Sequence, residues 1–162
     1  MTDLYLLRHG PATPKEEPYS PKDAKRPLTP KGKIRTDESV RGMLALGVAP
    51  EVAIVSPYTR TQETAAIAVK GLSVPTQEIN KDLIGVDPVP ILAQLQKRKE
   101  KRILLVGHDS HLQELTAFLT GEAVFKIARA GMVHLRVEKM GPKGGTLVKY
   151  YTPKMLKAAG KA

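Results

Sequence analysis

Three short segments place histidine and arginine side chains directly after predicted strands. They are residues 8–10 (Arg-His-Gly), 56–60 (Ser-Pro-Tyr-Thr-Arg) and 107–109 (Gly-His-Asp). Each follows a short apolar run, of which residues 103–106 form the strongest predicted strand. Because ligands of open α/β sheets bind beyond the carboxyl ends of strands, we expect the three segments to converge on one cleft. Two histidines and two arginines there predict a cationic site suited to a phosphoryl group.

The elements that must position these segments alternate between strands and helices. Strands are predicted at residues 4–7, 52–55, 76–79, 103–106, 133–137 and 146–151. Helices are predicted from Thr29-Pro30 to Gly47 and over residues 61–69, 91–99 and 110–120. This order predicts an α/β fold of three layers, with a mainly parallel sheet and helices on both faces. Alternation over residues 133–137 predicts an edge strand, and Ser110 with Gln113 predicts a capping box.

The same segments resemble the signature of the histidine phosphatase superfamily, whose members are also called phosphoglycerate-mutase-like. Residues 6–10 (Leu-Leu-Arg-His-Gly) resemble its N-terminal motif. Four further segments resemble the small SixA-type phosphohistidine phosphatases: residues 26–29, 55–60, 106–108 and 118–121. The resemblance covers nearly the whole chain in the same order and spacing. It implies the phosphoglycerate-mutase-like form of the fold and phosphatase activity.

The resemblance also implies a role for individual side chains. His9 is the nucleophile that becomes a phosphohistidine. Arg8, Arg60 and His108 hold the phosphate oxygens, and Arg26 grips the phosphate or the rest of the substrate. Water then hydrolyses the intermediate, and neither a metal nor a cofactor is required.

Elementary chemistry supports the assignment of His9. An imidazole attacks only through an unprotonated nitrogen, and the cationic neighbours Arg8 and Arg60 disfavour a further positive charge. The same arginines stabilise negative oxygens during phosphoryl transfer. The N–H on the other ring nitrogen of His9 needs an acceptor, for which we expect a backbone carbonyl.

The remaining candidates have competing interpretations. Gly10 is assigned to phosphate binding because it keeps side-chain bulk away from the nucleophile. Ser56 either contacts the substrate or caps the helix that follows. His108 and His111 have metal-pair spacing but no evident third ligand, so no metal site is predicted. His134 is expected to be exposed on the polar face of its strand.

The general acid is the open question of the sequence. Larger superfamily members have a catalytic glutamate between the second and third motifs, but residues 81–87 contain none. Asp82 and Asp109 are the two candidate proton donors. Asp109 also precedes a predicted helix, where the helix dipole favours an acid for structural reasons. A phosphohistidine substrate leaves as imidazole and needs less protonation than an ester.

Length and composition limit the other possibilities. The 162 residues fit one domain, residues 1–152, followed by a loose basic C-terminal tail at residues 153–162. There is no cysteine, which excludes disulfides, thiolate catalysis and cysteine-based zinc sites. No signal peptide or membrane-spanning run is expected, so the prediction is a cytoplasmic protein without a membrane partner.

The charge suggests an anionic partner. Lysine and arginine number 26 against 16 acids, a formal charge of +10. The basic residues are scattered and no nucleic-acid-binding motif is present, so nucleic acid is not the expected partner. The favoured hypothesis is a metal-independent phosphatase acting on protein phosphohistidine, for instance on an acidic phosphotransfer domain. The alternatives are a phosphomonoesterase acting on a small phosphate ester and a non-catalytic phosphate- or polyanion-binding module.

Overall fold

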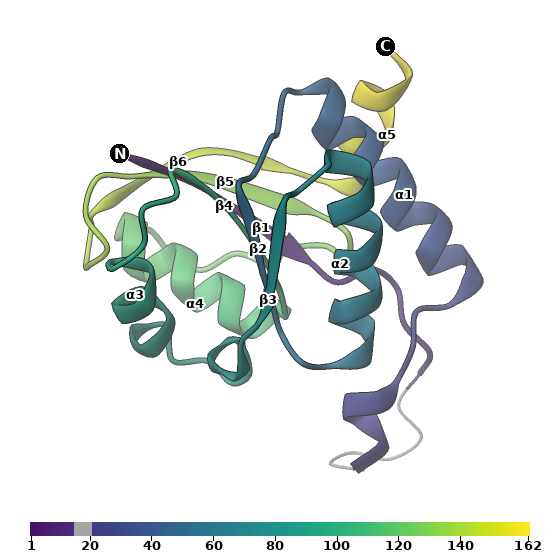
Figure 1. Cartoon of the computed structure of the whole chain (residues 1–162), viewed down its shortest axis with the longest axis horizontal. Helices are drawn as coiled ribbons and strands as arrows, with labels where there is room; N and C mark the ends of the chain where they lie inside the picture. Colours follow the sequence, from purple (N-terminus) through teal and green to yellow (C-terminus); the bar gives the residue numbers. More distant parts are fainter. Residues whose placement is uncertain (15–20) are drawn as a thin grey trace.

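A six-stranded sheet forms the centre of the computed structural model, which describes residues 1–14 and 21–162 (Figure 1). The strand order is β3-β2-β4-β1-β5-β6. The strands are β1 (Thr2–Arg8), β2 (Val52–Val55), β3 (Thr76–Ile79), β4 (Arg102–Gly107), β5 (Met132–Val137) and β6 (Gly145–Tyr151). β1 to β4 are mutually parallel, whereas β5 runs antiparallel to both β1 and β6. The prediction of a mainly parallel sheet is confirmed.

Helices cover both faces of the sheet (Figure 1). One face holds α1 (Pro30–Ala45), α2 (Thr59–Leu72) and α5 (Pro153–Lys161), and the other holds α3 (Val89–Leu95) and α4 (Asp109–Thr120). Two 3-10 helices, η1 (Pro21–Lys25) and η2 (Lys81–Leu83), lie in the connections. The predicted three-layer arrangement is therefore confirmed. No helix among residues 1–14 and 21–162 is long and apolar enough to cross a membrane.

Two apolar clusters, one on each face of the sheet, hold the layers together. Successive side chains of a strand point to opposite faces. Ile103 and Leu105 of β4 therefore enter the cluster with α3 and α4, whereas Leu104 and Val106 enter the cluster with α1, α2 and α5. All four side chains are fully buried. Strands covered by helices on both faces have continuous apolar sequences. This explains why the predicted bounds of these central strands lie close to the observed ones.

The ends of β1, β2 and β4 meet at one edge of the sheet. Arg8 lies opposite Gly107, and Val55 lies opposite Val106. α2 and α4 begin within a few residues of the strands that precede them. The N-terminal ends of both helices therefore lie at this edge, where their free N–H groups favour an anion.

Several predictions about individual elements are wrong. β5 is not an edge strand, because β6 lies outside it. His134 is not simply exposed: its Nε2 lies 2.8 Å from Asp3 Oδ1, and its ring stacks on Tyr5. These contacts cover the polar face of β5. Alternation of polar and apolar residues is the same in a strand covered in this way and in an edge strand, so the sequence does not distinguish them.

The bounds of two helices also differ from the prediction. α3 ends at Leu95, and α4 begins before Ser110, so no capping box forms.

The C-terminal residues form helix α5 instead of the predicted loose tail. Thr152 caps the helix by accepting a hydrogen bond from the Met155 N–H, and Pro153 occupies a first-turn position. Leu156 is fully buried in the cluster on the α1 face. The lysines of the segment suggest a solvated tail, but Leu156 and the pair of Lys157 with Glu38 hold the helix on α1.

Candidate active site

A cavity of about 500 Å³ opens at the carboxyl edge of the sheet. Its lining comes from the turns after β1 and β4, the first turn of α2 and the segment before β5. The lining residues are Arg8, His9, Ala12, Pro14, Arg26, Arg60, His108, Asp109, Ser110 and Arg129. The structure thus brings the predicted nucleophile, the predicted arginines, His108 and Asp109 to one place.

His9 is oriented by the residue that follows it. Its Nδ1 lies 2.7 Å from the Gly10 carbonyl oxygen, so Nδ1–H donates and Nε2 keeps its lone pair. The Gly10 N–H in turn donates to Thr64 Oγ1 at 3.0 Å. The Thr64 hydroxyl donates to the Arg60 carbonyl at 2.7 Å, which ties the loop to α2. The acceptor expected from the sequence is therefore the backbone carbonyl of the next residue.

Burial and nearby cations keep His9 neutral. The residue is 7% exposed, and burial is the main cause that lowers its pKa to about 4. Arg60, Arg8 and Arg26 lower the pKa further, while the hydrogen bond to the Gly10 carbonyl opposes the shift. The sequence interpretation named the arginines and missed the larger effect of burial. At neutral pH the imidazole is in the form that can attack.

Arg8 is held from two directions. Its Nη1 donates to the Ile127 carbonyl at 2.6 Å and lies 3.7 Å from Asp109 Oδ2. Asp109 Oδ1 accepts a hydrogen bond from the Ile127 N–H at 2.9 Å. Asp109 therefore fixes Arg8 and the segment before β5, and its carboxyl group also borders the cavity.

Asp23 forms ion pairs with Arg26 and Arg60, the other two arginines predicted for the site. Its Oδ1 lies 2.8 Å from Arg26 Nε, and its Oδ2 lies 3.6 Å from Arg60 Nη2. Arg60 Nη1 donates to the Asp23 carbonyl at 2.8 Å, and Arg26 Nη1 donates to the Thr13 carbonyl. These contacts hold both guanidinium groups at the cavity. The sequence interpretation missed Asp23, because it lies among lysines in a proline-rich loop without a motif of its own.

Buried donors in the cavity remain without a partner. Within the described part of the chain, Nε of Arg8 and Nε of Arg60 are buried and make no hydrogen bond. Unpaired buried donors are rare in folded proteins. Both arginines line the cavity, so their positive charge favours an anion there.

Ser56 lies behind His108 rather than in the cavity. Its hydroxyl is fully buried and 2.8 Å from His108 Nε2. Tyr58 packs edge-on against the His108 ring, with 4.9 Å between ring centroids. Burial, followed by the charge of Arg60, lowers the pKa of His108 to about 3. The cap residue of α2 is Tyr58, so the predicted cap role of Ser56 is wrong. The hydroxyl of Ser56 contacts His108, and Ser56 is not among the described residues that line the cavity.

Gly10 allows the loop after β1 to lie against α1. A Cβ at Gly10 would come within 2.2 Å of Thr36 Oγ1, and a Cβ at Gly32 within 1.9 Å of the Pro11 carbonyl oxygen. Gly10 is not among the cavity-lining residues. Its absent side chain makes room for α1, and its carbonyl orients His9.

Two further candidates lie away from the cavity lining. Asp82, on η2, accepts a hydrogen bond from the Gln94 side chain. His111 is fully buried, with Nε2 3.1 Å from the Asp87 carbonyl. Arg129 does line the cavity, and the sequence interpretation missed it. It belongs to an irregular segment between α4 and β5, where no strand end or motif indicates a site.

The fold and the cavity define an α/β protein with a neutral histidine among several arginines. Residues 4–87 match the model of the histidine phosphatase superfamily (branch 1). These residues are just over half of the chain, and the protein belongs to that superfamily. Membership supports phosphatase activity. A comparison with curated protein sequences found no match.

Solved structures of this superfamily have the same fold. The protein histidine phosphatase SixA complexed with tungstate is 24% identical, with a TM-score of 0.84 over 96% of this chain and 100% of that chain. A protein from Agrobacterium tumefaciens, assigned as a SixA phosphohistidine phosphatase, is 17% identical, with a TM-score of 0.78 over 94% and 99% of the two chains. Mycobacterial glucosyl-3-phosphoglycerate phosphatase is 13% identical, with a TM-score of 0.72 over 94% and 99%. At these identities the likeness concerns the fold.

Proposed function

We propose that this protein is a metal-independent phosphatase that removes phosphate from phosphohistidine on a protein. His9 Nε2 attacks the phosphorus, the P–N bond of the substrate breaks, and the substrate imidazole leaves with a proton drawn from solvent. Water then attacks the phosphorus of phospho-His9. The P–N bond to Nε2 breaks, inorganic phosphate leaves, and neutral His9 is regenerated.

The orientation and protonation state of His9 provide the main support. The Gly10 carbonyl holds Nδ1–H, so the lone pair is on Nε2, and burial keeps the ring neutral. A non-catalytic anion-binding module would have no need of a buried neutral imidazole, because a cation binds phosphate better. The tungstate in the SixA structure is a tetrahedral oxyanion like phosphate.

The arginines supply the positive charge that the transfer requires. Arg8, Arg26 and Arg60 line the cavity together with His9. Their guanidinium groups are fixed before the substrate arrives, so they need little reorganisation as charge develops on the phosphoryl oxygens. We therefore assign the charge stabilisation to guanidinium groups and place no metal in the reaction.

The acid chemistry of the cavity favours phosphohistidine over an ester. Among the described lining residues, Asp109 has the only carboxyl group. Both of its oxygens are engaged, one by the Ile127 N–H and one by Arg8. An alkoxide leaving group needs a proton donor, whereas imidazole needs less help. A small phosphomonoesterase remains the second candidate, because Asp109 does border the cavity.

A labelling experiment tests the covalent mechanism. Rapid quenching after mixing with a phosphoramidate donor should trap an acid-labile, alkali-stable phosphoryl group on the wild-type protein and none on His9→Ala. His134→Ala is the matched control, because His134 pairs with Asp3 away from the cavity. Label of equal intensity on His9→Ala, or no label on the wild type, contradicts the mechanism.

A comparison of leaving groups tests the substrate class. We expect kcat/KM for a phosphohistidine protein to exceed that for alkyl phosphate esters, and Asp109→Asn to leave the leaving-group dependence unchanged. If alkyl esters are turned over faster, and Asp109→Asn slows them by about 100-fold or more while sparing 4-nitrophenyl phosphate, Asp109 is a general acid and the protein is an esterase.

A further inference from the structure

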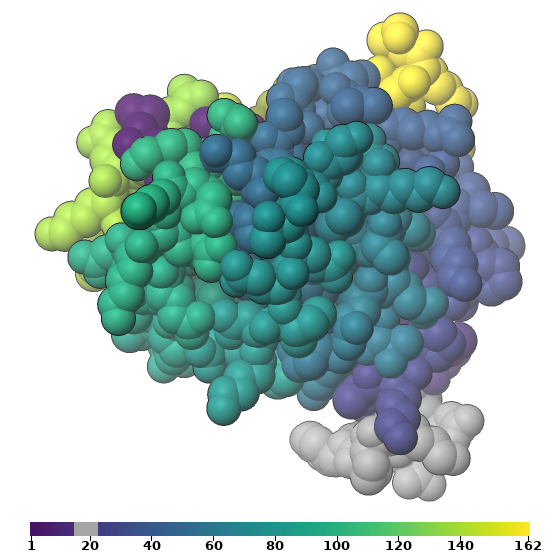
Figure 2. Space-filling model, viewed as in Figure 1, coloured from purple at the N-terminus to yellow at the C-terminus, as the bar shows by residue number. Residues whose placement is uncertain are grey.

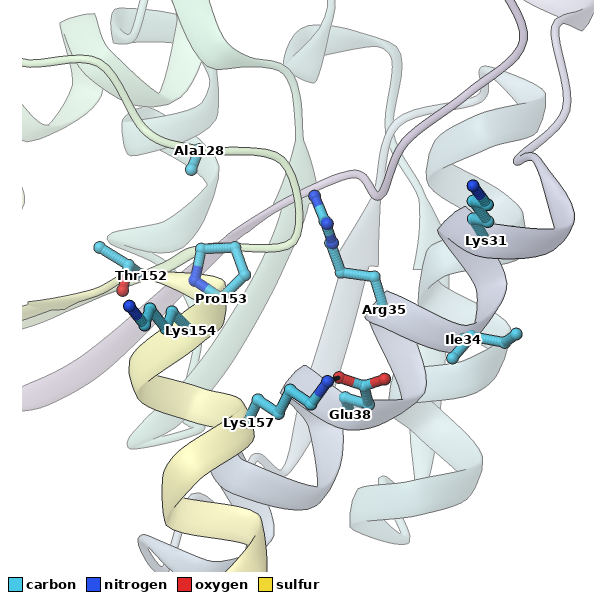
Figure 3. Close-up of a pocket in the computed structure, with 9 residues that line it drawn as sticks. All are labelled: Lys31, Ile34, Arg35, Glu38, Ala128, Thr152, Pro153, Lys154 and Lys157. Carbon is cyan, nitrogen blue, oxygen red and sulfur yellow. Dashed lines mark ion pairs between the residues drawn. The ribbon is translucent and has the colours of Figure 1, made fainter.

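A second hollow in the surface lies between α1 and the beginning of α5. It has a volume of about 590 Å³ (Figure 3). Lys31 and Arg35 of α1 and Lys154 and Lys157 of α5 line it. Figure 3 shows Arg35 and Lys157 in the space between the two helices. We call this hollow the basic groove. Figure 2 shows α5 beside α1 at one end of the molecule, away from α3 and α4.

The basic groove has an excess of uncompensated positive charge. The described lining residues include four with basic and one with an acidic side chain. The acid, Glu38, is paired with Lys157, whose Nζ lies 3.1 Å from Glu38 Oε2. Within the described part of the chain, Lys31, Arg35 and Lys154 form no ion pair and are exposed. The groove therefore presents three cationic side chains that are not paired with a carboxylate of the described residues.

The groove also contains an apolar contact point. Ile34 lies between Lys31 and Arg35 on α1, lines the groove and is 61% exposed. Its side chain points away from the core that α1 buries. An exposed isoleucine among cations fits an amphipathic acidic protein segment. Among the described residues that line the groove, none is aromatic, so none offers a surface on which a nucleic-acid base could stack.

The basic groove and the active-site cavity come near each other at residues 128 and 129. Ala128 lines the groove, and its neighbour Arg129 lines the cavity. Arg129 is exposed and forms no ion pair in the described part of the chain. A macromolecule seated in the groove can therefore place a phosphorylated side chain at His9. A small ester fits the cavity without reaching the groove.

We infer that the basic groove docks an acidic, amphipathic segment of the phosphoprotein substrate, with Arg35 and Lys154 as its principal cations and Ile34 as its apolar contact. This inference rests on the proposed function, since it assumes that the substrate is a protein. It assigns selection of the substrate to a surface outside the catalytic cavity.

Charge reversal in the groove tests the inference. The variant combines Arg35→Glu with Lys154→Glu; both positions are exposed, and a glutamate suits the first turn of α5. The matched control combines Lys97→Glu with Lys99→Glu, an equal change of charge at exposed positions after α3. The probes are a phosphohistidine peptide extended by a Glu- and Asp-rich amphipathic helix, the same peptide with Gln and Asn instead, and 4-nitrophenyl phosphate.

We expect the groove variant to raise KM for the acidic peptide by about tenfold at low salt, with kcat unchanged. The control variant, the neutral peptide and 4-nitrophenyl phosphate should show less than about a twofold change. An equal loss in both charge-reversal variants would mean that net charge alone attracts the substrate, which overturns a docking groove. An unchanged KM in the groove variant overturns it as well.

A binding measurement separates this inference from the proposed function. The unphosphorylated acidic peptide should bind the wild type, and bind the groove variant about tenfold more weakly, in fluorescence anisotropy titrations at low salt. If no phosphohistidine peptide is hydrolysed, the proposed function fails, but a selective loss of binding still supports the groove. If single-stranded RNA binds the groove more tightly than the acidic peptide does, a protein partner is wrong.

Discussion

At the scale of single residues, the chemistry of His9 depends on its two immediate neighbours in the chain. Gly10 supplies the carbonyl that fixes the tautomer, and Arg8 supplies a cation that disfavours protonation. Burial adds the largest effect on the pKa. The nucleophile is therefore prepared by the fold before any substrate binds.

The titration of His9 follows directly from this environment. An exposed histidine titrates near pH 6.5, whereas His9 has a pKa lowered to about 4. The ring should therefore remain neutral as the pH falls from 8 to 5 and take up a proton only near pH 4. Resolved NMR shifts of the His9 ring nitrogens would report this midpoint. Arg60→Gln should raise the midpoint, because it removes one of the cations that lower it; a wild-type midpoint near 6.5 would contradict the assignment.

Ser56 offers a second test at this scale. Ser56→Ala removes the hydroxyl 2.8 Å from His108 Nε2 and should lower kcat by about tenfold with little change in KM. The ring nitrogen shifts of His108 should change in the same variant, and Ser56→Thr, which keeps a hydroxyl, should restore part of the rate. Ser39→Ala is the matched control, because Ser39 is equally buried and its hydroxyl has no partner among the described residues. Equal rate losses in both alanine variants would point to a general packing effect.

At the scale of elements, the loop after β1 is placed by its contact with α1. Gly10 and Gly32 permit this contact, and the Thr64 hydroxyl holds the loop from α2. The nucleophile thus depends on two helices that contribute no reacting atom. A small movement of α1 would change the direction of His9 Nε2.

Gly32→Ala tests this dependence. The new Cβ would lie 1.9 Å from the Pro11 carbonyl oxygen, so the loop must shift. We expect the free energy of unfolding to fall by about 1–3 kcal/mol, and kcat to fall by more than about tenfold at temperatures where the variant is fully folded. Denaturant unfolding and steady-state kinetics measure the two effects. Gly141→Ala is the control, because its Cβ would meet nothing closer than 4.0 Å; wild-type kinetics in Gly32→Ala would disprove the coupling.

The sequence predicts an element well where a run of buried apolar residues defines it. It predicts poorly where a few tertiary contacts determine the position of an element. The central parallel strands β1, β2 and β4 contain continuous buried apolar runs, and β2 has the predicted bounds. The edge strand β3 also has its predicted bounds, although it is mostly exposed. α5 packs on α1 through a few contacts, such as the burial of Leu156 and the pair of Lys157 with Glu38. β5 pairs with β1 and β6, and the polar His134 on it contacts Asp3, far away in the chain. Such contacts leave no periodic signal in the sequence.

The same division applies to the site. His9, Arg8, Arg60 and His108 follow strand ends or begin helices, so their convergence could be predicted from topology. Asp23 and Arg129 lie in irregular segments, and only the folded chain brings them to the cavity. The sequence correctly predicts that Ser56 lies near the site. It does not predict that the Ser56 hydroxyl points to His108, because that direction depends on side-chain packing.

At the scale of the whole molecule, the active-site cavity and the basic groove are two hollows lined largely by basic residues. The net charge of +10 acts over longer distances and attracts anionic partners before contact. The same charge makes acid conditions unfavourable, because every additional proton increases repulsion within the folded protein.

Acid sensitivity of the fold is the prediction that belongs to this scale. Burial lowers the pKa of His9 to about 4 and that of His108 to about 3, whereas both titrate near 6.5 when unfolded. Between these values the unfolded chain binds protons that the native protein does not, so stability is complete above about pH 6.5 and falls as the pH drops toward 4. Each histidine contributes up to about 1.4 kcal/mol per pH unit in that window.

Urea unfolding at pH 7 and pH 5 measures this effect. The free energy of unfolding should fall between the two pH values in the wild type, and clearly less in a His9→Asn, His108→Asn double variant. An equal loss in both proteins would mean that His9 and His108 do not govern the acid response, and that the net charge or the buried His111, whose pKa burial also lowers, does.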